Sequence, residues 1–148
     1  MAAASTGAAT PKWVIDLHGL KDCLTTTSNS AKAAVIDAIR RGEMLIMKSV
    51  SAELKDLYPH LWPLLKTITP KAYIKTTVAN HASATALQEL HGSGVLGGLP
   101  MFAHFEAVAV ARSNGCKLVS AGKALKECRQ IANGCGIPKS EVLGISDL

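Results

Sequence analysis

Short apolar runs alternate with longer amphipathic segments along most of this chain. The short runs are rich in Val, Ile, Leu and Met and are bounded by glycine or polar residues, which is typical of buried strands. Strands are predicted at 13–17, 44–47, 71–77 and 116–120. Helical spacing in the longer segments predicts helices over 31–41, 78–91, 101–114 and 122–133. This alternation favours an α/β fold with a mostly parallel central sheet of four or five strands, flanked by helices on both faces.

Capping and helix-breaking residues set the limits of the other segments. Ser30 is the predicted N-cap of the first helix, and Ser49 or Ser51 is predicted to cap a helix after the second strand. Pro59 and Pro63 are expected to end or kink that helix. Loops are predicted at 22–30 and 93–100, and one short final element is predicted within 138–148.

The composition favours one folded domain over a disordered or membrane-spanning chain. Apolar residues make up 48% of the 148 residues, which is enough for a hydrophobic core over most of the length. Residues 1–12, rich in Ala, Ser, Thr and Gly, are predicted to be a disordered tail without the features of a secretory signal, and 13–148 to form a single domain. No apolar stretch approaches the roughly twenty residues that cross a bilayer, so no membrane partner is expected.

Net charge and cysteine spacing bear on the expected binding partner and on the expected cellular compartment. The formal net charge of +5 favours a polyanionic partner such as RNA or DNA, although no run of Lys and Arg marks a nucleic-acid-binding tail. The four cysteines have neither C-x-x-C nor zinc-type spacing. Free thiols in a reducing compartment are therefore expected, which favours a cytoplasmic location.

One acidic residue at the end of the first apolar run is the most informative position for function. Asp16 follows Val14-Ile15 and precedes His18-Gly19, where the strand is expected to end. A carboxylate buried there costs free energy unless it is paired, hydrogen-bonded or metal-bound. Either it caps the following turn by accepting backbone N–H groups, or it belongs to a functional site at the carboxyl end of a parallel strand. We favour the functional site.

A second acid follows the second strand. Glu53 lies in the first helical turn, within Ser51-Ala52-Glu53-Leu54. Acids in this position commonly compensate the helix dipole or take part in capping, so Glu53 alone would carry no functional weight. If the first two strands are neighbours, however, Glu53 and Asp16 meet at one edge of the sheet and supply two carboxylates for a metal.

The order of these elements resembles the PIN domain family from Trp13 to the C-terminus. The segment 14–18 resembles the family's opening strand, where Asn is more common at the last position. The segment 51–54 resembles its second acidic element. The late helix and strand of the family have counterparts in 104–111 and 115–120.

The resemblance implies an endonuclease that depends on Mg²⁺ or Mn²⁺ and usually acts on RNA. In the family, three or four carboxylates gather hard divalent cations, and the metal activates water and neutralises charge on the phosphate in flight. Many small members are toxins of toxin–antitoxin pairs, and many form homodimers. A helical antitoxin segment and a second copy of the chain are therefore the implied protein partners.

Two of the acidic positions expected from the resemblance are absent. His104 stands where the late helix is expected to begin with Asp, and Gly122 stands where Asp is expected after the late strand. Asp16 and Glu53 remain as the implied catalytic acids and metal ligands. Glu106 lies two positions past His104, about 200° around the helix, so it is expected to face elsewhere. The losses imply weak or altered activity and a metal that binds weakly or not at all.

Four further side chains are candidates for the pocket. His104 is predicted to line it, as a general base, as a ligand for a transition metal, or as a helix-terminal residue bonded to solvent or to Asp16. Lys123 would either contact substrate or neutralise Asp16 in an ion pair. Ser120 is expected to contact metal-bound water or phosphate, and His18 to contact substrate or orient Asp16.

Two other interpretations compete with a metal-dependent ribonuclease. One is a non-catalytic PIN-like module that binds RNA or a protein. The other is a small-molecule α/β enzyme unrelated to nucleases, which a closed apolar pocket away from Asp16 would favour. The sequence contains no G-x-S-x-G elbow, no H-E-x-x-H and no dinucleotide fingerprint after the first strand.

Overall fold

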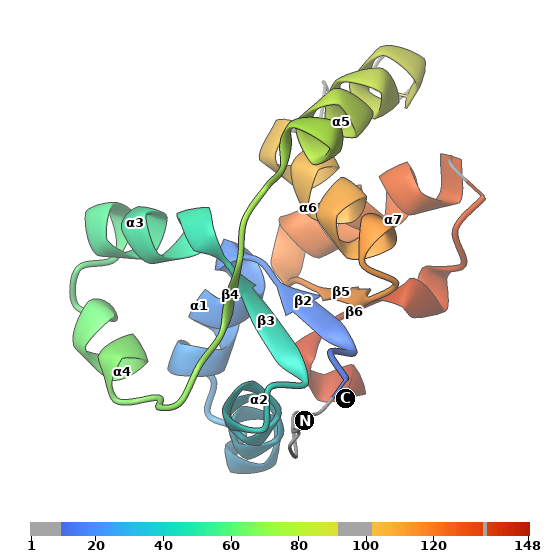
Figure 1. The fold of residues 1–148 in the computed structure, drawn as a ribbon. Coiled ribbons are helices and arrows are strands. Elements are labelled where there is room, and N and C mark those ends of the chain that lie inside the picture. Colours follow the sequence, from blue (N-terminus) through green and yellow to red (C-terminus); the bar gives the residue numbers. More distant parts are fainter. Residues whose placement is uncertain (1–9, 92–101, 135) are drawn as a thin grey trace.

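The centre of the protein is a five-stranded, all-parallel sheet (Figure 1). The computed structural model describes residues 10–91, 102–134 and 136–148. Its strands run in the spatial order β4-β3-β2-β5-β6. They comprise β2 (Trp13–Ile15), β3 (Met44–Met47), β4 (Tyr73–Ile74), β5 (Lys117–Val119) and β6 (Val142–Leu143). The predicted α/β fold with a parallel sheet is confirmed.

The strand order places the start of the chain in the middle of the sheet. Successive strands are added on one side of β2, as β3 and β4, and then on its other side, as β5 and β6. In register, Ile15 at the end of β2 lies opposite Ile46 and Val119. The direction of addition therefore reverses between β2 and β5, and ligands of such sheets bind at the carboxyl edge beside that reversal.

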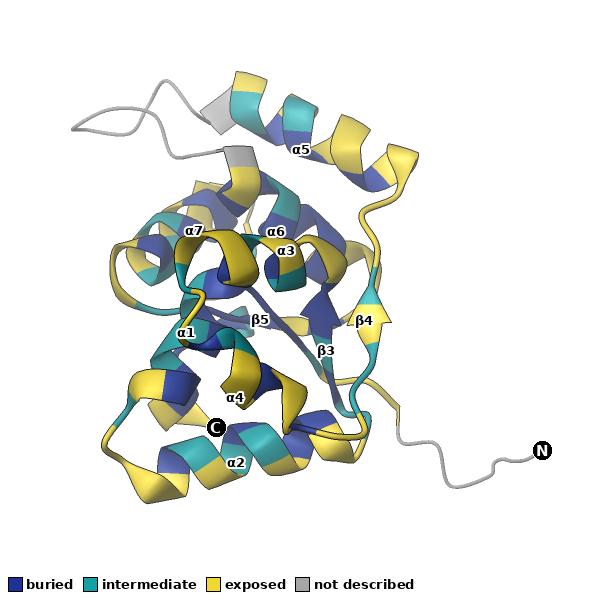
Figure 2. Ribbon diagram, turned by 90° about the vertical axis from the view of Figure 1, so that its left-hand side faces the viewer, coloured by how far each residue is buried: buried dark blue, intermediate teal, exposed yellow. Residues whose placement is uncertain are grey.

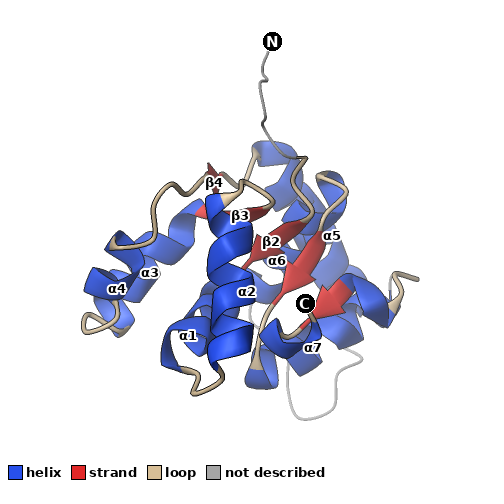
Figure 3. Cartoon of the chain, turned by 90° about the horizontal axis from the view of Figure 1, so that it is seen from below, coloured by secondary structure: helices blue, strands red, loops and turns tan. Residues whose placement is uncertain are grey.

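Helices cover both faces of the sheet, with α2 on one side of the strands and α5 and α6 on the other (Figure 2). Viewed from below, α1 and α2 lie together in front of the strands (Figure 3). Of the described residues, none forms a helix that is both long and apolar enough to cross a membrane. The helices are α1 (Leu17–Thr25), α2 (Asn29–Arg40), α3 (Lys48–Leu57), α4 (Trp62–Lys66), α5 (Val78–His91), α6 (Phe102–Ser113) and α7 (Gly122–Gly134), with short 3-10 turns η2 (Lys139–Glu141) and η3 (Ile145–Asp147).

The prediction of a loop over 22–30 was wrong in its first half, because α1 begins directly after the first strand. Asp16 caps this helix, so His18-Gly19 continues the chain as helix instead of breaking it. The apolar residues at Leu17, Leu20 and Leu24 have helical spacing and are buried. Of the polar residues that favoured a loop, Asp22 and Thr25 lie in this helix, and 26–28 connect it to α2.

Two predicted helix caps were also wrong. The helix α2 is capped by Ser28, whose Oγ accepts the N–H of Ala31 at 3.3 Å, and not by Ser30. The helix α3 begins at Lys48 immediately after β3 and has no side-chain cap, so neither Ser49 nor Ser51 fills that role. In both cases the chain enters the helix earlier than the polar residues indicate. The predicted glycine-rich loop at 93–100 lies outside the described residues.

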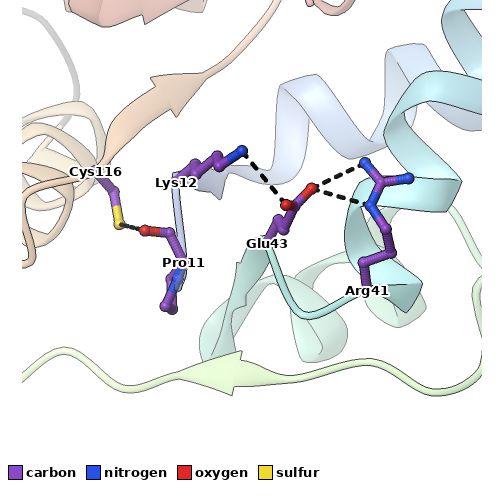
Figure 4. A network of polar contacts seen from close by, with 5 residues as sticks. All are labelled: Pro11, Lys12, Arg41, Glu43 and Cys116. Atoms are coloured by element: carbon purple, nitrogen blue, oxygen red, sulfur yellow. Dashed lines mark hydrogen bonds and ion pairs between the residues drawn. The ribbon is translucent and has the colours of Figure 1, made fainter. Parts of the chain in front are cut away.

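The predicted disordered tail at 1–12 extends too far, because Lys12 is already bonded to residues on both sides of β2. Its N–H donates to the carbonyl of Glu43 at 2.7 Å, and its carbonyl accepts the N–H of Lys117 at 2.9 Å. The Glu43 carboxylate pairs with Lys12 and Arg41 at 3.4 and 2.9 Å (Figure 4). These contacts fix the amino end of β2 between β3 and β5.

One glycine allows the first helix to approach the sheet closely. A Cβ atom at Gly19 would lie 2.7 Å from the carbonyl oxygen of Val119 and 3.0 Å from the Cγ1 of Ile15. The nearer atom belongs to the backbone of β5, so it cannot move away as a flexible side chain does. Glycine at this position therefore holds the start of α1 against the carboxyl ends of β2 and β5.

We expect Gly19→Ala to lower the free energy of unfolding by about 1–3 kcal/mol, because the added methyl group overpacks the contact with β5. Urea denaturation monitored by circular dichroism measures the change. Ala33→Gly, at an exposed position of α2, is the matched control and should cost about 1 kcal/mol through helix propensity alone. A Gly19→Ala variant more stable than the wild type would contradict the close approach.

Candidate functional site

Asp16 joins three elements at the carboxyl edge of the sheet. Its Oδ1 accepts the N–H of Gly19 at 2.8 Å, and its Oδ2 accepts the hydroxyl hydrogen of Ser120 at 2.7 Å. Its own N–H donates to the carbonyl of Val119 at 3.1 Å. Asp16 is therefore the N-cap of α1, as one of the two sequence hypotheses held, and it is also bonded to the end of β5.

Burial makes the charged form of Asp16 unfavourable. The residue is only 6% exposed, and desolvation raises the pKa of its carboxyl above the ordinary value. The hydrogen bonds from Ser120 and Gly19, and the nearby rings of His18 and His104, lower that pKa without reversing the shift. The local donors therefore compensate only part of the cost of a buried negative charge.

A cavity of about 370 Å³ brings the two predicted acids together. Asp16 and Glu53 both line it, together with Glu106, His18 and His104. We call it the acidic cavity. Burial is the main cause that raises the pKa of Glu53, and the charges of Asp16 and Glu106 raise it further, whereas a hydrogen bond with Ser49 lowers it. Three carboxylates thus share one partly desolvated space.

The prediction that Glu106 faces away from the pocket was wrong. Ala103 and Glu106 are three positions apart, so they lie on the same face of α6, and both line the acidic cavity. His104 lies at the edge of that face and reaches the cavity with its ring. Positions 104 and 106 are indeed about 200° apart around the helix. The prediction failed because His104 does not lie at the centre of the face that lines the cavity. The Glu106 carboxylate also lies 3.6 Å from His81 Nδ1.

His104 bonds neither to solvent nor to Asp16, in contrast to one of its predicted roles. It is 5% exposed, and its Nδ1 lies 3.2 Å from the Oε1 of Glu127 in α7. Its Nε2 is buried and has no hydrogen-bond partner. The rings of His104 and His18 meet edge to face, with centroids 5.6 Å apart.

His18 and His104 line a second cavity as well as the acidic one. This second cavity, of about 480 Å³, is also lined by Lys21, Asp22, Lys123 and Glu127, and by the first turn of α7. We call it the lysine cavity. Residues that follow β2 and β5 line the two cavities, so both lie at the carboxyl edge of the sheet. The lysine cavity is not uniformly basic, because its two ammonium groups lie together with two carboxylates.

Two predicted substrate-binding residues occupy different positions. Ser120 is fully buried and donates its hydroxyl to Asp16, so it orients the acid. Lys123 lines the lysine cavity, but its side chain is 89% exposed and lies 3.8 Å from Glu127, not beside Asp16. The alternative in which Lys123 neutralises Asp16 was therefore wrong, because α7 directs this side chain outwards.

Glu106, Glu127, Lys21 and Asp22 are charged residues of the site that sequence reasoning missed. Glu106 is discernible from its spacing to Ala103, once the cavity face of α6 is known. Glu127 lies one helical turn after Lys123 in the helix that follows β5. No local signal distinguishes it from an ordinary exposed acid, because its partner His104 lies in another helix.

A third cavity, of about 240 Å³, lies away from Asp16 at the amino end of β5. It is lined by apolar residues such as Val108 and Leu118, together with Arg112 and Glu141. Parallel sheets bind ligands at their carboxyl edge, so the position of this cavity does not favour a functional site.

Oxygen ligands are present in the acidic cavity, and their chemistry fits a hard divalent cation. Across 10–91, 102–134 and 136–148, however, no three His, Cys, Asp or Glu side chains converge as a metal site requires. No family model matches this chain, and no curated protein matches it. The functional hypothesis therefore depends on the residues and their positions in the sheet.

The raised pKa of Asp16 predicts how stability changes with pH. Because the folded-state pKa lies above the unfolded one, the stabilising contribution of this group is present below the unfolded pKa and is lost as the pH rises through the folded-state value. Asp16→Asn removes the titration. We expect the variant to equal the wild type in stability near about pH 3.5 and to exceed it near about pH 7.5.

Urea denaturation at both pH values measures this difference. Asp56→Asn, at an exposed position of α3, is the control for the loss of one negative charge. A stability difference between Asp16→Asn and the wild type that stays constant with pH would show that Asp16 is not destabilised by its surroundings.

Proposed function

We propose that this chain is a PIN-like, metal-dependent endoribonuclease, whose activity is weakened by the loss of two acidic positions. The observation that carries the proposal is that Asp16 and Glu53, which follow two adjacent central strands, line one cavity. Burial is the main cause that raises the pKa of both carboxyl groups, so the surrounding residues stabilise their charged forms incompletely. A divalent cation would supply the missing positive charge.

Asp16 and Glu53 would hold Mg²⁺ or Mn²⁺ in the acidic cavity. When bound, the metal would neutralise charge on the scissile phosphate and activate water. Ser120 and the Gly19 N–H hold the Asp16 carboxylate in place, since each of its oxygens accepts one of these hydrogen bonds. Each oxygen keeps a second lone pair for a cation. Ser120 is therefore a positioning residue in this proposal.

Features around the histidine pair support RNA as the substrate class. The chain carries a formal net charge of +5, and Lys21 and Lys123 line the lysine cavity beside the acidic one. Phosphates that flank the scissile bond would bind the two ammonium groups, although Asp22 and Glu127 line the same cavity. The Lys21 ammonium lies 4.6 Å from the ring centroid of Tyr58, which lines the acidic cavity and offers a face for base stacking.

The alternative is a non-catalytic PIN-like module that binds RNA or a protein. It is favoured by the absence, within the described ranges, of three metal-ligating side chains in one group. His104 and Gly122 occupy the positions where the family resemblance implies acids. Binding to RNA needs only the basic residues and the aromatic face, and would survive the loss of a metal.

The expected protein partners are a second copy of the chain and an antitoxin-type helical segment. Leu57 and Leu64 are exposed to 61% and 42%, and Val78 to 89%, so apolar surface is available for either. A cytoplasmic location is expected from the thiols, because Cys23, Cys116 and Cys128 are free. Burial raises the pKa of the Cys23 thiol to about 11, which keeps it unreactive.

We expect the wild type to cleave single-stranded RNA in Mn²⁺ or Mg²⁺ and to stop when EDTA removes the metal. Asp16→Asn and Glu53→Gln should each lower kcat/KM at least about 100-fold, because each removes a metal carboxylate. Ser120→Ala should cost roughly 10- to 100-fold through misorientation of Asp16. Gel assays with a 5′-labelled oligonucleotide measure the rates.

Glu89→Gln, at an exposed position of α5, is the matched control and should retain wild-type rates. RNA binding is measured in parallel by fluorescence anisotropy at two salt concentrations. Salt-sensitive binding with no cleavage in either metal would replace the nuclease proposal by the binding module. Cleavage that persists in Asp16→Asn would exclude the acidic cavity as the active site.

A further inference from the structure

The Nε2 atom of His104 is a buried polar atom without a partner. The residue is 5% exposed, and no hydrogen bond reaches this nitrogen. Buried polar atoms are almost always hydrogen-bonded, and the exceptions call for an explanation, which includes a catalytic role. His104 lines both the acidic cavity and the lysine cavity.

The partner of the other ring nitrogen fixes where the proton of His104 resides. Nδ1 lies 3.2 Å from the Oε1 of Glu127, and an ionised carboxylate can only accept a hydrogen bond. In the neutral ring Nδ1 must therefore carry the hydrogen, which leaves the lone pair of Nε2 free to accept a proton. The second oxygen of Glu127 lies 3.8 Å from the Lys123 ammonium.

This arrangement is the one that an oriented general base requires. A carboxylate on one nitrogen sets the tautomer and the ring orientation, and the other nitrogen points its lone pair at the proton to be taken. The neighbouring elements hold the ring, since α7 supplies Glu127 and α1 supplies the edge-to-face contact with His18. Glu127 is 15% exposed in its side chain, so water competes little for the bond.

We infer that His104 is the general base that deprotonates the attacking water, and that Glu127 is its positioning residue. The inference rests on the proposed nuclease function. One water O–H proton passes to Nε2 while the water oxygen forms the new bond to phosphorus. The P–O bond to the leaving sugar oxygen breaks, and that oxygen takes a proton from solvent. His104 then returns its proton to solvent, which closes the cycle.

Several charged groups surround this ring and bear on its behaviour with pH. They come from each element packed against it and from its own helix. These groups are Asp16, His18, Lys21 and Asp22 at or in α1, Glu53 on α3, Glu127 and Lys123 on α7, and Glu106 on α6. Because both signs of charge are present, the base role is tested with the His104 and Glu127 variants together.

The tautomer is tested by long-range ¹⁵N–¹H NMR of the ¹⁵N-labelled protein, without metal or substrate. Assignment comes from the signal that disappears in His104→Gln. We expect the neutral wild-type ring to carry its proton on Nδ1, and Glu127→Ala to move the population towards the Nε2–H form. Glu127→Gln is the second variant, which retains the packing if Glu127→Ala fails to fold. A wild-type ring in the Nε2–H form would overturn the dyad.

The catalytic role is tested by pH–rate profiles of RNA cleavage in Mn²⁺. His104→Gln and Glu127→Ala should lower kcat by about 10²–10⁴-fold with little change in KM, as expected for the loss of a general base. His104→Gln should also remove the acidic limb of the wild-type profile. Glu89→Gln is again the control.

The failures of the two proposals are distinguishable. A wild type that does not cleave RNA in either metal removes the nuclease function, and the base role with it. A wild type that cleaves, with His104→Gln retaining both its kcat and its acidic limb, leaves the nuclease intact and overturns the base role. A merely structural contribution of Glu127 would lower the thermal midpoint without changing the pH profile or the tautomer.

Discussion

The carboxylate of Asp16 is the interaction on which the architecture of this edge depends. It caps α1 and accepts a hydrogen bond from the hydroxyl of Ser120, and the backbone N–H of Asp16 donates to the carbonyl of Val119 at the end of β5. The first helix, the central strand and the strand across the reversal are thereby fixed to one another. Gly19 completes the junction, because only a residue without a side chain permits α1 to lie against the Val119 carbonyl.

Much of this fold can be predicted from local patterns, and the limits of such patterns have a physical origin. The strands at 44–47 and 116–120 are clear because continuous apolar runs suit a sheet buried on both faces. The helix α1 is harder to see, because His18-Gly19 indicates a break and the polar residues from Asp22 onwards indicate a loop, although its leucines have helical spacing. Both hypotheses for Asp16 can be drawn from the sequence, because a strand-end acid can cap the next helix and also line a site; the structure shows the cap.

The candidate site is less accessible to sequence reasoning, because helix-to-helix contacts decide it. Asp16 and Glu53 follow adjacent strands, so their meeting at one edge follows from the parallel sheet. The contact of His104 with Glu127 depends on the packing of α6 on α7, which no spacing within either helix encodes. Likewise Glu106 enters the cavity because of how α6 is rotated about its axis. The pattern of each helix defines its apolar face, but it does not define which polar side chains contact a neighbouring helix.

The charge balance of the site explains how an imidazole can stand where the family resemblance implies an acid. Burial raises the pKa of Asp16 and Glu53, and the charges of Asp16 and Glu106 raise the pKa of Glu53 further. A further carboxylate at position 104 would add repulsion that only a bound cation could offset. An imidazole at position 104 adds no negative charge to the cavity, and its partner Glu127 lies in the lysine cavity, beside Lys123. In the proposed nuclease, this exchange would favour a stable protein with weak cation affinity and would leave proton transfer to the side chains.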